Sequence, residues 1–96
     1  MRIIAAQARP EPPTPACVAL PVDMFFRRDG EALISWNARQ LEALAVCATC
    51  PIREACLADA LRFPAAEQHG IQGGTTAEQR RAIIRRASRD GRRAAA

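Results

Sequence analysis

The chain has 96 residues, 49% of them hydrophobic, and a formal net charge of +4. This length allows one small domain, whose core is marginal without a staple such as a metal centre or disulfides. No apolar run approaches a membrane span and no secretory pattern opens the sequence, so we expect a soluble cytoplasmic protein. The positive charge is local. Residues 80–96 hold seven Arg against Asp90 alone, which gives +6, and residues 1–79 hold seven Arg against nine acidic residues, which gives −2.

The first predicted segment is a Pro-rich arm over residues 1–16. Four of the ten residues from 8 to 17 are proline, which rules out a helix or a central strand and predicts an extended, disordered arm. Ordered structure is expected to begin at Cys17. After it, Phe25 and Phe26 form an aromatic pair, whose role the sequence leaves open between core packing and partner contact. Asp29-Gly30 predicts a turn.

Two helices are predicted in the middle of the chain. Trp36, Leu41 and Leu44 recur at near-helical spacing after Ser35, a candidate N-cap, which predicts a helix from about residue 35 that runs into residue 47. Pro51 suits the first turn of a second helix, which Pro64 would terminate. No strand pattern stands out. We therefore predict an all-α fold, a small irregular domain of three to four helices.

A Gly-rich turn and a basic helix are predicted next. Three of the five glycines fall in "GIQGG", residues 70–74. Thr75 with Glu78, or Thr76 with Gln79, forms a capping box for a third helix. The acidic residues near this helix are too few to pair its arginines, which favours nucleic-acid contact over a merely solvated face. The arginines predicted to contact DNA are Arg80, Arg81, Arg85, Arg86, Arg89, Arg92 and Arg93.

The four cysteines are Cys17, Cys47, Cys50 and Cys56. Cys47 ends one predicted helix, Cys50 lies in the connection and Cys56 is in the next helix, so three sulfurs can converge at a helical corner while Cys17 returns from the N-terminal loop. Four thiolates suit either tetrahedral zinc or an iron–sulfur cluster, and the spacing leaves both open. A third reading is thiol chemistry at "CATC". That chemistry needs a thiolate, which a helix N-terminus stabilises and a helix C-terminus disfavours. Cys50, just before a predicted helix, therefore has the favourable position, and Cys47, at the C-terminal end of another, has the unfavourable one.

The order of four motifs resembles one known family. The four motifs, in chain order, are a lone cysteine before "DMFF", then "CATCPIREAC", then "HGIQGG" and then the arginine-rich "AEQRRAIIRR". The sequence is similar in this respect to the WhiB-like proteins of actinobacteria and their phages. The resemblance implies one 4Fe-4S cluster per chain, with Cys17, Cys47, Cys50 and Cys56 as ligands and with disulfides in the apo form. It also implies a transcriptional regulator that senses oxygen or nitric oxide and is not an enzyme, with no small-molecule substrate.

The resemblance further implies two macromolecular partners. The basic C-terminal end, residues 75–96, would contact DNA, and the cluster domain, residues 17–74, would bind region 4 of the primary sigma factor. Gln72 stands where the family's turn usually carries Trp, which helps to make the sigma interface. A zinc-stabilised DNA-binding module and an apo-form disulfide reductase remain the alternatives. The predicted partner contacts are Phe25, Phe26, Gly70, Ile71, Gln72, Gly73 and Gly74.

Overall fold

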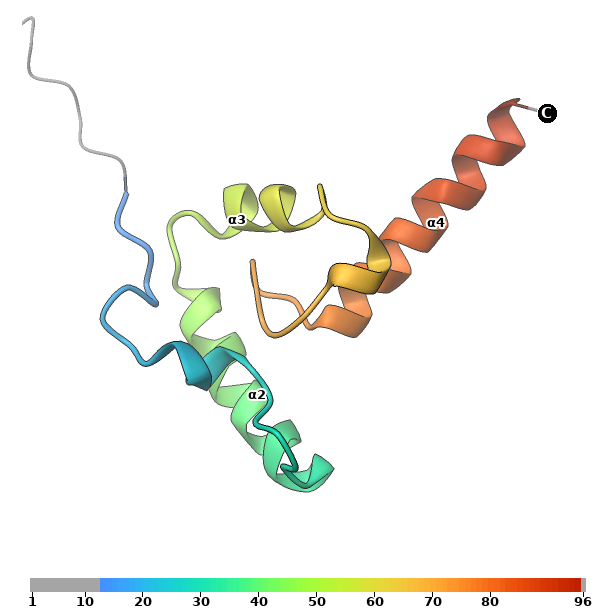
Figure 1. Cartoon of the computed structure of the whole chain (residues 1–96). Helices are drawn as coiled ribbons and strands as arrows, with labels where there is room; N and C mark the ends of the chain where they lie inside the picture. Colours follow the sequence, from blue (N-terminus) through green and yellow to red (C-terminus); the bar gives the residue numbers. More distant parts are fainter. Residues whose placement is uncertain (1–12, 96) are drawn as a thin grey trace, which may run out of the picture.

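The computed structural model describes residues 13–95, and these form a helical fold (Figure 1). Its elements are η1 (Val22–Phe25), α2 (Leu33–Ala48), α3 (Arg53–Ala60), η2 (Ala65–Glu67) and α4 (Ala77–Ala95). Within residues 13–95 there is no strand, only an isolated bridge between Gln72 and Thr75. The all-α prediction is confirmed. Most of the predicted arm, residues 1–12, lies outside the described residues, and no helix among residues 13–95 has the length and apolar character to cross a bilayer.

Helix α2 begins earlier than predicted. Its N-cap is Ala32, and Ser35, the predicted cap, lies inside the first turn. The Ser35 hydroxyl donates a hydrogen bond to Glu31 Oε2 at 2.8 Å instead of capping a backbone N–H. The prediction of Ser35 as the N-cap was wrong because its hydroxyl donates a hydrogen bond to the carboxylate of Glu31, one turn earlier in the chain.

Helix α3 is shorter than the predicted helix at both ends. Pro51 precedes its first residue, and the helix ends at Ala60, before Pro64 is reached. The side-chain amide of Gln68 donates hydrogen bonds to the carbonyl oxygens of Ala60 at 2.7 Å and Phe63 at 3.0 Å. Because these bonds satisfy carbonyls at the helix end from another segment, the helix stops without needing a proline.

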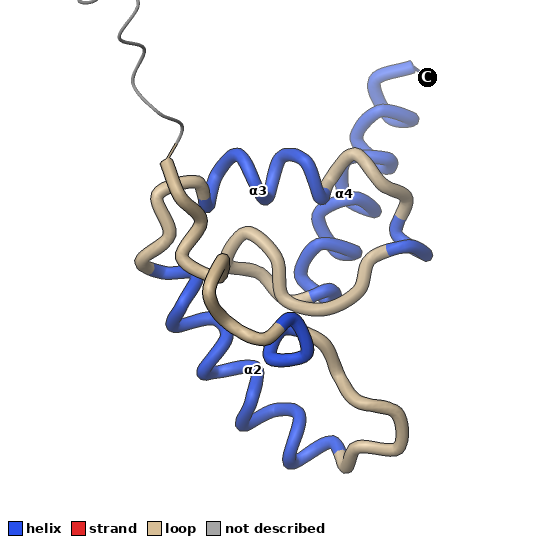
Figure 2. The backbone as a smooth tube through the Cα atoms, turned by 60° about the vertical axis from the view of Figure 1, so that its left-hand side comes forward, coloured by secondary structure: helices blue, strands red, loops and turns tan. Residues whose placement is uncertain are grey.

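A small core joins η1, α2 and the Gly-rich turn. Phe25, Trp36, Ala43 and Ile71 are buried together, and Cys47 packs against them. The Ile71 N–H donates to the Phe25 carbonyl oxygen at 2.8 Å, which holds the turn against η1. Figure 2 shows these loops lying between α2 and the pair α3 and α4. Phe25 therefore belongs to the core.

An ion pair fixes the loop between η1 and α2. Arg39 donates to both carboxylate oxygens of Glu31, at 2.6 and 2.8 Å, and to the carbonyl oxygens of Asp23 and Phe26, each at 2.9 Å. The Arg39 guanidinium also lies 5.1 Å from the centre of the Trp36 ring. The hydrogen bonds from Arg39 hold the pKa of Glu31 well below its ordinary value.

Replacing Glu31 by Gln is expected to lower the free energy of unfolding at pH 7. A depressed pKa stabilises the fold above the unfolded-state pKa of about 4.3 and loses this effect as pH falls toward the folded-state pKa. The difference between wild type and Glu31→Gln should therefore shrink as pH falls below about 4. Urea unfolding followed by circular dichroism at several pH values measures it. Glu54→Gln, at an exposed position of α3, is the control, and an identical pH response of both variants would contradict the argument.

Candidate functional site

All four cysteines line one cavity of about 300 Å³. Cys47 comes from the last turn of α2, Cys50 from the connection and Cys56 from the first turn of α3. The rest of the wall is mostly apolar and includes Val22, Phe25, Val46, Ile52 and Ile71. The helical corner therefore brings together the thiols that the sequence spacing suggested.

The N-terminal loop returns to this corner. The Ala16 N–H donates to the Cys50 Sγ at 3.5 Å, which places the neighbouring Cys17 at the cavity. Cys17 is exposed, whereas Cys47, Cys50 and Cys56 are half-buried. The exposed thiol thus lines the same cavity as the three thiols of the helical corner.

The Cys47 thiol is influenced by its burial and by the other three cysteines. Burial raises the pKa of the Cys47 thiol, a hydrogen bond from the Gly74 N–H opposes the rise, and charge on Cys56, Cys50 and Cys17 adds to it. Within residues 13–95 no three His, Cys, Asp or Glu side chains lie close enough to hold a single metal ion. Four thiols spread around one apolar cavity suit a group larger than one ion, and an iron–sulfur cluster takes four cysteine thiolates.

Two glycines of the Gly-rich turn pack too closely against neighbouring backbone to be replaced by a residue with a Cβ atom. Gly73 has φ +58, and a Cβ atom built on it would lie 2.6 Å from the backbone nitrogen and Cα of Leu57. Gly70, at φ +65, would place a Cβ 2.5 Å from the Phe25 carbonyl oxygen. Backbone contact at these two positions explains why the turn beside the cysteines needs glycine.

Gly73→Ala is expected to destabilise the fold much more than Gly30→Ala. Gly30 has a similar φ of +73 but nothing within 4 Å of its Cβ position. Gly30→Ala should therefore cost only the strain of a left-handed Ala, roughly 1 kcal/mol, while Gly73→Ala adds a collision with the α3 backbone. Thermal unfolding of the two variants measures the difference. Equal losses would show that the turn can move away from α3.

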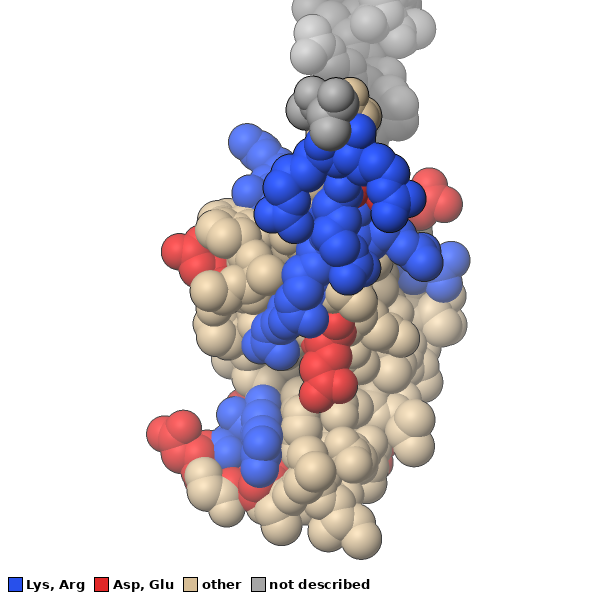
Figure 3. All heavy atoms as spheres, turned by 90° about the vertical axis from the view of Figure 1, so that its right-hand side faces the viewer, with Lys and Arg blue, Asp and Glu red and all other residues tan. Residues whose placement is uncertain are grey.

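The predicted DNA-contacting arginines gather on α4. Figure 3 shows their side chains over the α4 end of the molecule. Arg85, Arg86, Arg89, Arg92 and Arg93 are exposed. Among the described residues the ion pairs join Arg28 to Asp23 and Arg39 to Glu31, so none uses an arginine of α4. The capping box of α4 is formed by Thr76 and Gln79, and not by Thr75 and Glu78. The Thr76 N–H donates to Gln79 Oε1 at 2.8 Å, and the Gln79 N–H donates to Thr76 Oγ1 at 3.1 Å.

Arg80 is a correction to the predicted set. Its exposed fraction is 0%, and its guanidinium donates only to groups inside the protein. It is therefore not available to DNA. The signal for this burial was present in the sequence, because Arg80 shares a helix face with Ala77, Ile84 and Ala87. Arg81 is half-buried and donates to the Gln68 carbonyl oxygen at 2.8 Å.

Gln68 is a structural residue that the sequence analysis missed. Its exposed fraction is 2%, and it accepts a hydrogen bond from Arg80 Nε at 2.6 Å while its amide donates to the end of α3. It therefore joins α3 to α4. A polar residue before a Gly-rich turn gives no sequence signal for this role.

The predicted partner-contact residues divide into buried and accessible groups. Phe25 and Ile71 have exposed fractions of 7% and 3%, and Gly73 is also buried, so these three do not present a surface. The half-buried members are Phe26, Gly70, Gln72 and Gly74. His69 is exposed and does not line the cysteine cavity.

Comparison with known proteins gives consistent matches. Residues 13–83 match the family model described as "Transcription factor WhiB". The transcriptional regulator WhiD of Streptomyces coelicolor is 36% identical over 72 residues, which cover 75% of this chain and 62% of WhiD. The redox- and pH-responsive transcriptional regulator WhiB3 of Mycobacterium tuberculosis is 32% identical over 69 residues, covering 72% and 66%. The transcriptional regulator WhiB1 of Bifidobacterium longum is 46% identical over 48 residues, half of each chain. The chain thus spans just under two thirds of the length of the first two relatives.

Proposed function

We propose, from the premise that the chain belongs to the WhiB family of transcription factors, that it is a redox-responsive transcriptional regulator of the cytoplasm and not an enzyme. It binds one 4Fe-4S cluster through Cys17, Cys47, Cys50 and Cys56 and binds DNA through α4. The observation that carries the proposal is the single apolar cavity lined by four thiols from separate parts of the chain. The redox-responsive character is inferred from the mycobacterial relative WhiB3, a redox- and pH-responsive transcriptional regulator.

The cysteines hold the fold together through the bound group. When bound, a 4Fe-4S cluster supplies a redox-sensitive centre held by four thiolates. Cys17 then ties the N-terminal loop to the corner formed by Cys47, Cys50 and Cys56. Because such ligation is scarce in an unfolded chain, its binding free energy is also folding free energy. Loss of ligation would release the loop at Cys17, which makes an order-to-disorder switch.

The exposed arginines of α4 supply the DNA-binding part of the proposal. Five of them are exposed, and none forms an ion pair within residues 13–95. Arg forms bidentate bonds to phosphate oxygens and to guanine edges. Phosphate contacts orient a protein on DNA without specifying a sequence, so promoter choice requires a further partner or a few base contacts.

Region 4 of the primary sigma factor is the protein partner that we propose. The accessible part of the predicted contact set is Phe26, Gly70, Gln72 and Gly74, and of these Phe26 and Gln72 line the cysteine cavity. Gln72 presents an amide where the family usually presents Trp, so this contact would be more polar and weaker. Size-exclusion chromatography of the loaded protein with isolated sigma region 4 tests it, with Gln72→Trp expected to bind more tightly than wild type.

Metal analysis of anaerobically purified protein is the decisive test of the cluster. We expect iron and acid-labile sulfide in equal amounts, close to four of each per chain for this cluster type. One zinc per chain without sulfide would replace the proposal with a zinc-stabilised DNA-binding module. The disulfide reductase alternative is tested by turnover of a disulfide substrate by apo-protein and by Cys47→Ser. Burial raises the pKa of Cys47 and disfavours that thiol as the attacking thiolate. Equal rates for apo-protein and Cys47→Ser would remove this alternative.

A further inference from the structure

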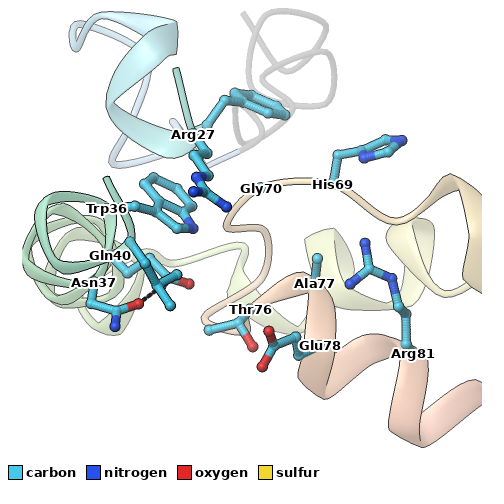
Figure 4. A pocket seen from close by; sticks show the side chains of 12 residues that line it. Arg27, Trp36, Asn37, Gln40, His69, Gly70, Thr76, Ala77, Glu78 and Arg81 are labelled. Carbon is cyan, nitrogen blue, oxygen red and sulfur yellow. Dashed lines mark hydrogen bonds between the residues drawn. The ribbon is translucent and has the colours of Figure 1, made fainter. Parts of the chain in front are cut away.

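Helix α4 is attached to the rest of the protein mainly at its first turns. It packs against η2, while an open groove of about 550 Å³ lies between the start of α4 and α2. Figure 4 shows Trp36 and Gln40 of α2 on one side of this groove and Thr76 and Glu78 on the other. In Figure 1 the C-terminal part of α4 extends away from the other helices. Packing on α2 therefore does not set the direction of α4.

A single buried side chain connects α4 to the Gly-rich turn. All three guanidinium nitrogens of Arg80 donate hydrogen bonds, and the exposed fraction of the residue is 0%. The acceptors are Gln68 Oε1 at 2.6 Å, the carbonyl oxygens of Gly70 at 2.7 Å, His69 at 2.8 Å, Thr75 at 2.8 Å and Gln72 at 3.3 Å, and Thr75 Oγ1 at 3.1 Å. Four backbone carbonyls of one turn thus depend on one guanidinium.

The same turn forms part of the wall of the cysteine cavity. Ile71, Gln72 and Gly73 line the cavity, and Cys47 packs against the buried cluster that contains Ile71. The turn therefore lines the cysteine cavity with Ile71, Gln72 and Gly73 and is bonded to α4 through its carbonyl oxygens.

We propose that Arg80 is a positioning residue that couples ligation at the four cysteines to the orientation of α4. Ligation fixes Cys47 and the turn that packs beside it around the cavity, and the guanidinium carries this order to the first turn of α4. This inference rests on the proposed function and adds to it a route from the sensing site to the basic helix. A guanidinium suits this site because its five donors project from three nitrogens in a fixed plane and reach six acceptors, whereas an ammonium group has three donors on one nitrogen.

Hydrogen exchange on Arg80→Lys tests the coupling without changing net charge. Protein is reconstituted anaerobically with iron and sulfide, and exchange is measured by mass spectrometry with and without loading. In wild type, loading should slow exchange in residues 46–57, 69–76 and 77–82. In Arg80→Lys, residues 46–57 should still be protected, while residues 77–82 should exchange roughly tenfold faster than in loaded wild type because several hydrogen bonds of a charged donor are lost. Arg85→Lys, at an exposed position, is the matched control and should behave as wild type.

Equal protection of residues 77–82 in loaded wild type and Arg80→Lys would overturn the proposal. If Arg80→Lys does not fold, Thr75→Val replaces it. It removes the Thr75 Oγ1 atom, which accepts from Arg80 at 3.1 Å and donates to the Gln72 carbonyl oxygen at 2.7 Å, while the guanidinium stays in place. That variant should speed exchange of residues 77–82 by roughly threefold, and no change would equally overturn the coupling. Absent protection of residues 46–57 in wild type would count against the cluster itself. In that case the role of Arg80 is tested separately: residues 77–82 should still exchange faster in Arg80→Lys than in Arg85→Lys. Equal exchange in these two variants would reject the role of Arg80 as well.

Discussion

Replacing Cys17 by Ala is expected to reduce bound iron and sulfide to background and to remove much of the helical circular dichroism signal, as fully as Cys50→Ala does. Although Cys17 is the most exposed of the four cysteines, in the proposed cluster it would supply one of the four bonds to the bound group and the only one from the N-terminal loop. Losing it removes both a ligand and the closure of the loop, and the lost binding free energy is lost folding free energy. Iron and sulfide analysis with far-UV circular dichroism under anaerobic conditions measures both effects.

Val18→Ala is the control for Cys17→Ala. Val18 is in the same loop, and its exposed fraction is 67%, so its truncation should change neither loading nor helicity. A normal cluster in Cys17→Ala would show that the fourth ligand comes from elsewhere. His69 would be the first residue to test in that event, although it does not line the cysteine cavity in this structure.

The cysteine corner was predictable because its determinants are local. Cys47, Cys50 and Cys56 are close in sequence, and a helix end followed by Pro51 turns the chain between them. The return of Cys17 could only be inferred from the need for a fourth thiol. The structure shows its means, the hydrogen bond from Ala16 N–H to Cys50 Sγ. Helical spacing grouped Trp36 with Leu41 and Leu44, and it is a weaker guide to burial, since the exposed fraction is 9% for Trp36 and 70% for Leu41.

What the sequence did not predict depends on contacts between distant segments. The end of α3 is set by Gln68, which reaches back to Ala60 and Phe63, so the nearby proline was a misleading signal. The start of α2 involves Glu31, whose carboxylate accepts from Ser35 and Arg39. A charged residue is usually assigned to the surface, and Arg80 is an exception because the turn carbonyls supply enough acceptors to bury a guanidinium.

Replacing Arg85, Arg86, Arg89 and Arg92 together by Ala is expected to weaken binding to duplex DNA while leaving iron and sulfide content unchanged. These side chains are exposed and lie outside the cysteine cavity. Each lost phosphate contact should reduce the slope of log affinity against log salt by roughly 0.9, so four lost contacts should flatten it by roughly 3.6. Fluorescence anisotropy with a labelled duplex at several salt concentrations measures the slope.

A pair of charge-matched double variants separates contact from net charge. Arg85→Ala with Arg89→Ala removes two positive charges from α4, and Arg28→Ala with Arg62→Ala removes two from exposed positions elsewhere. If α4 contacts DNA, the first pair should flatten the slope by roughly 1.8 and the second should leave it nearly unchanged. Equal effects would mean that DNA responds only to the total charge of the protein. An unchanged slope in the quadruple variant would mean that the arginines of α4 form a solvated helix face, and the DNA-binding part of the proposed function would then be wrong.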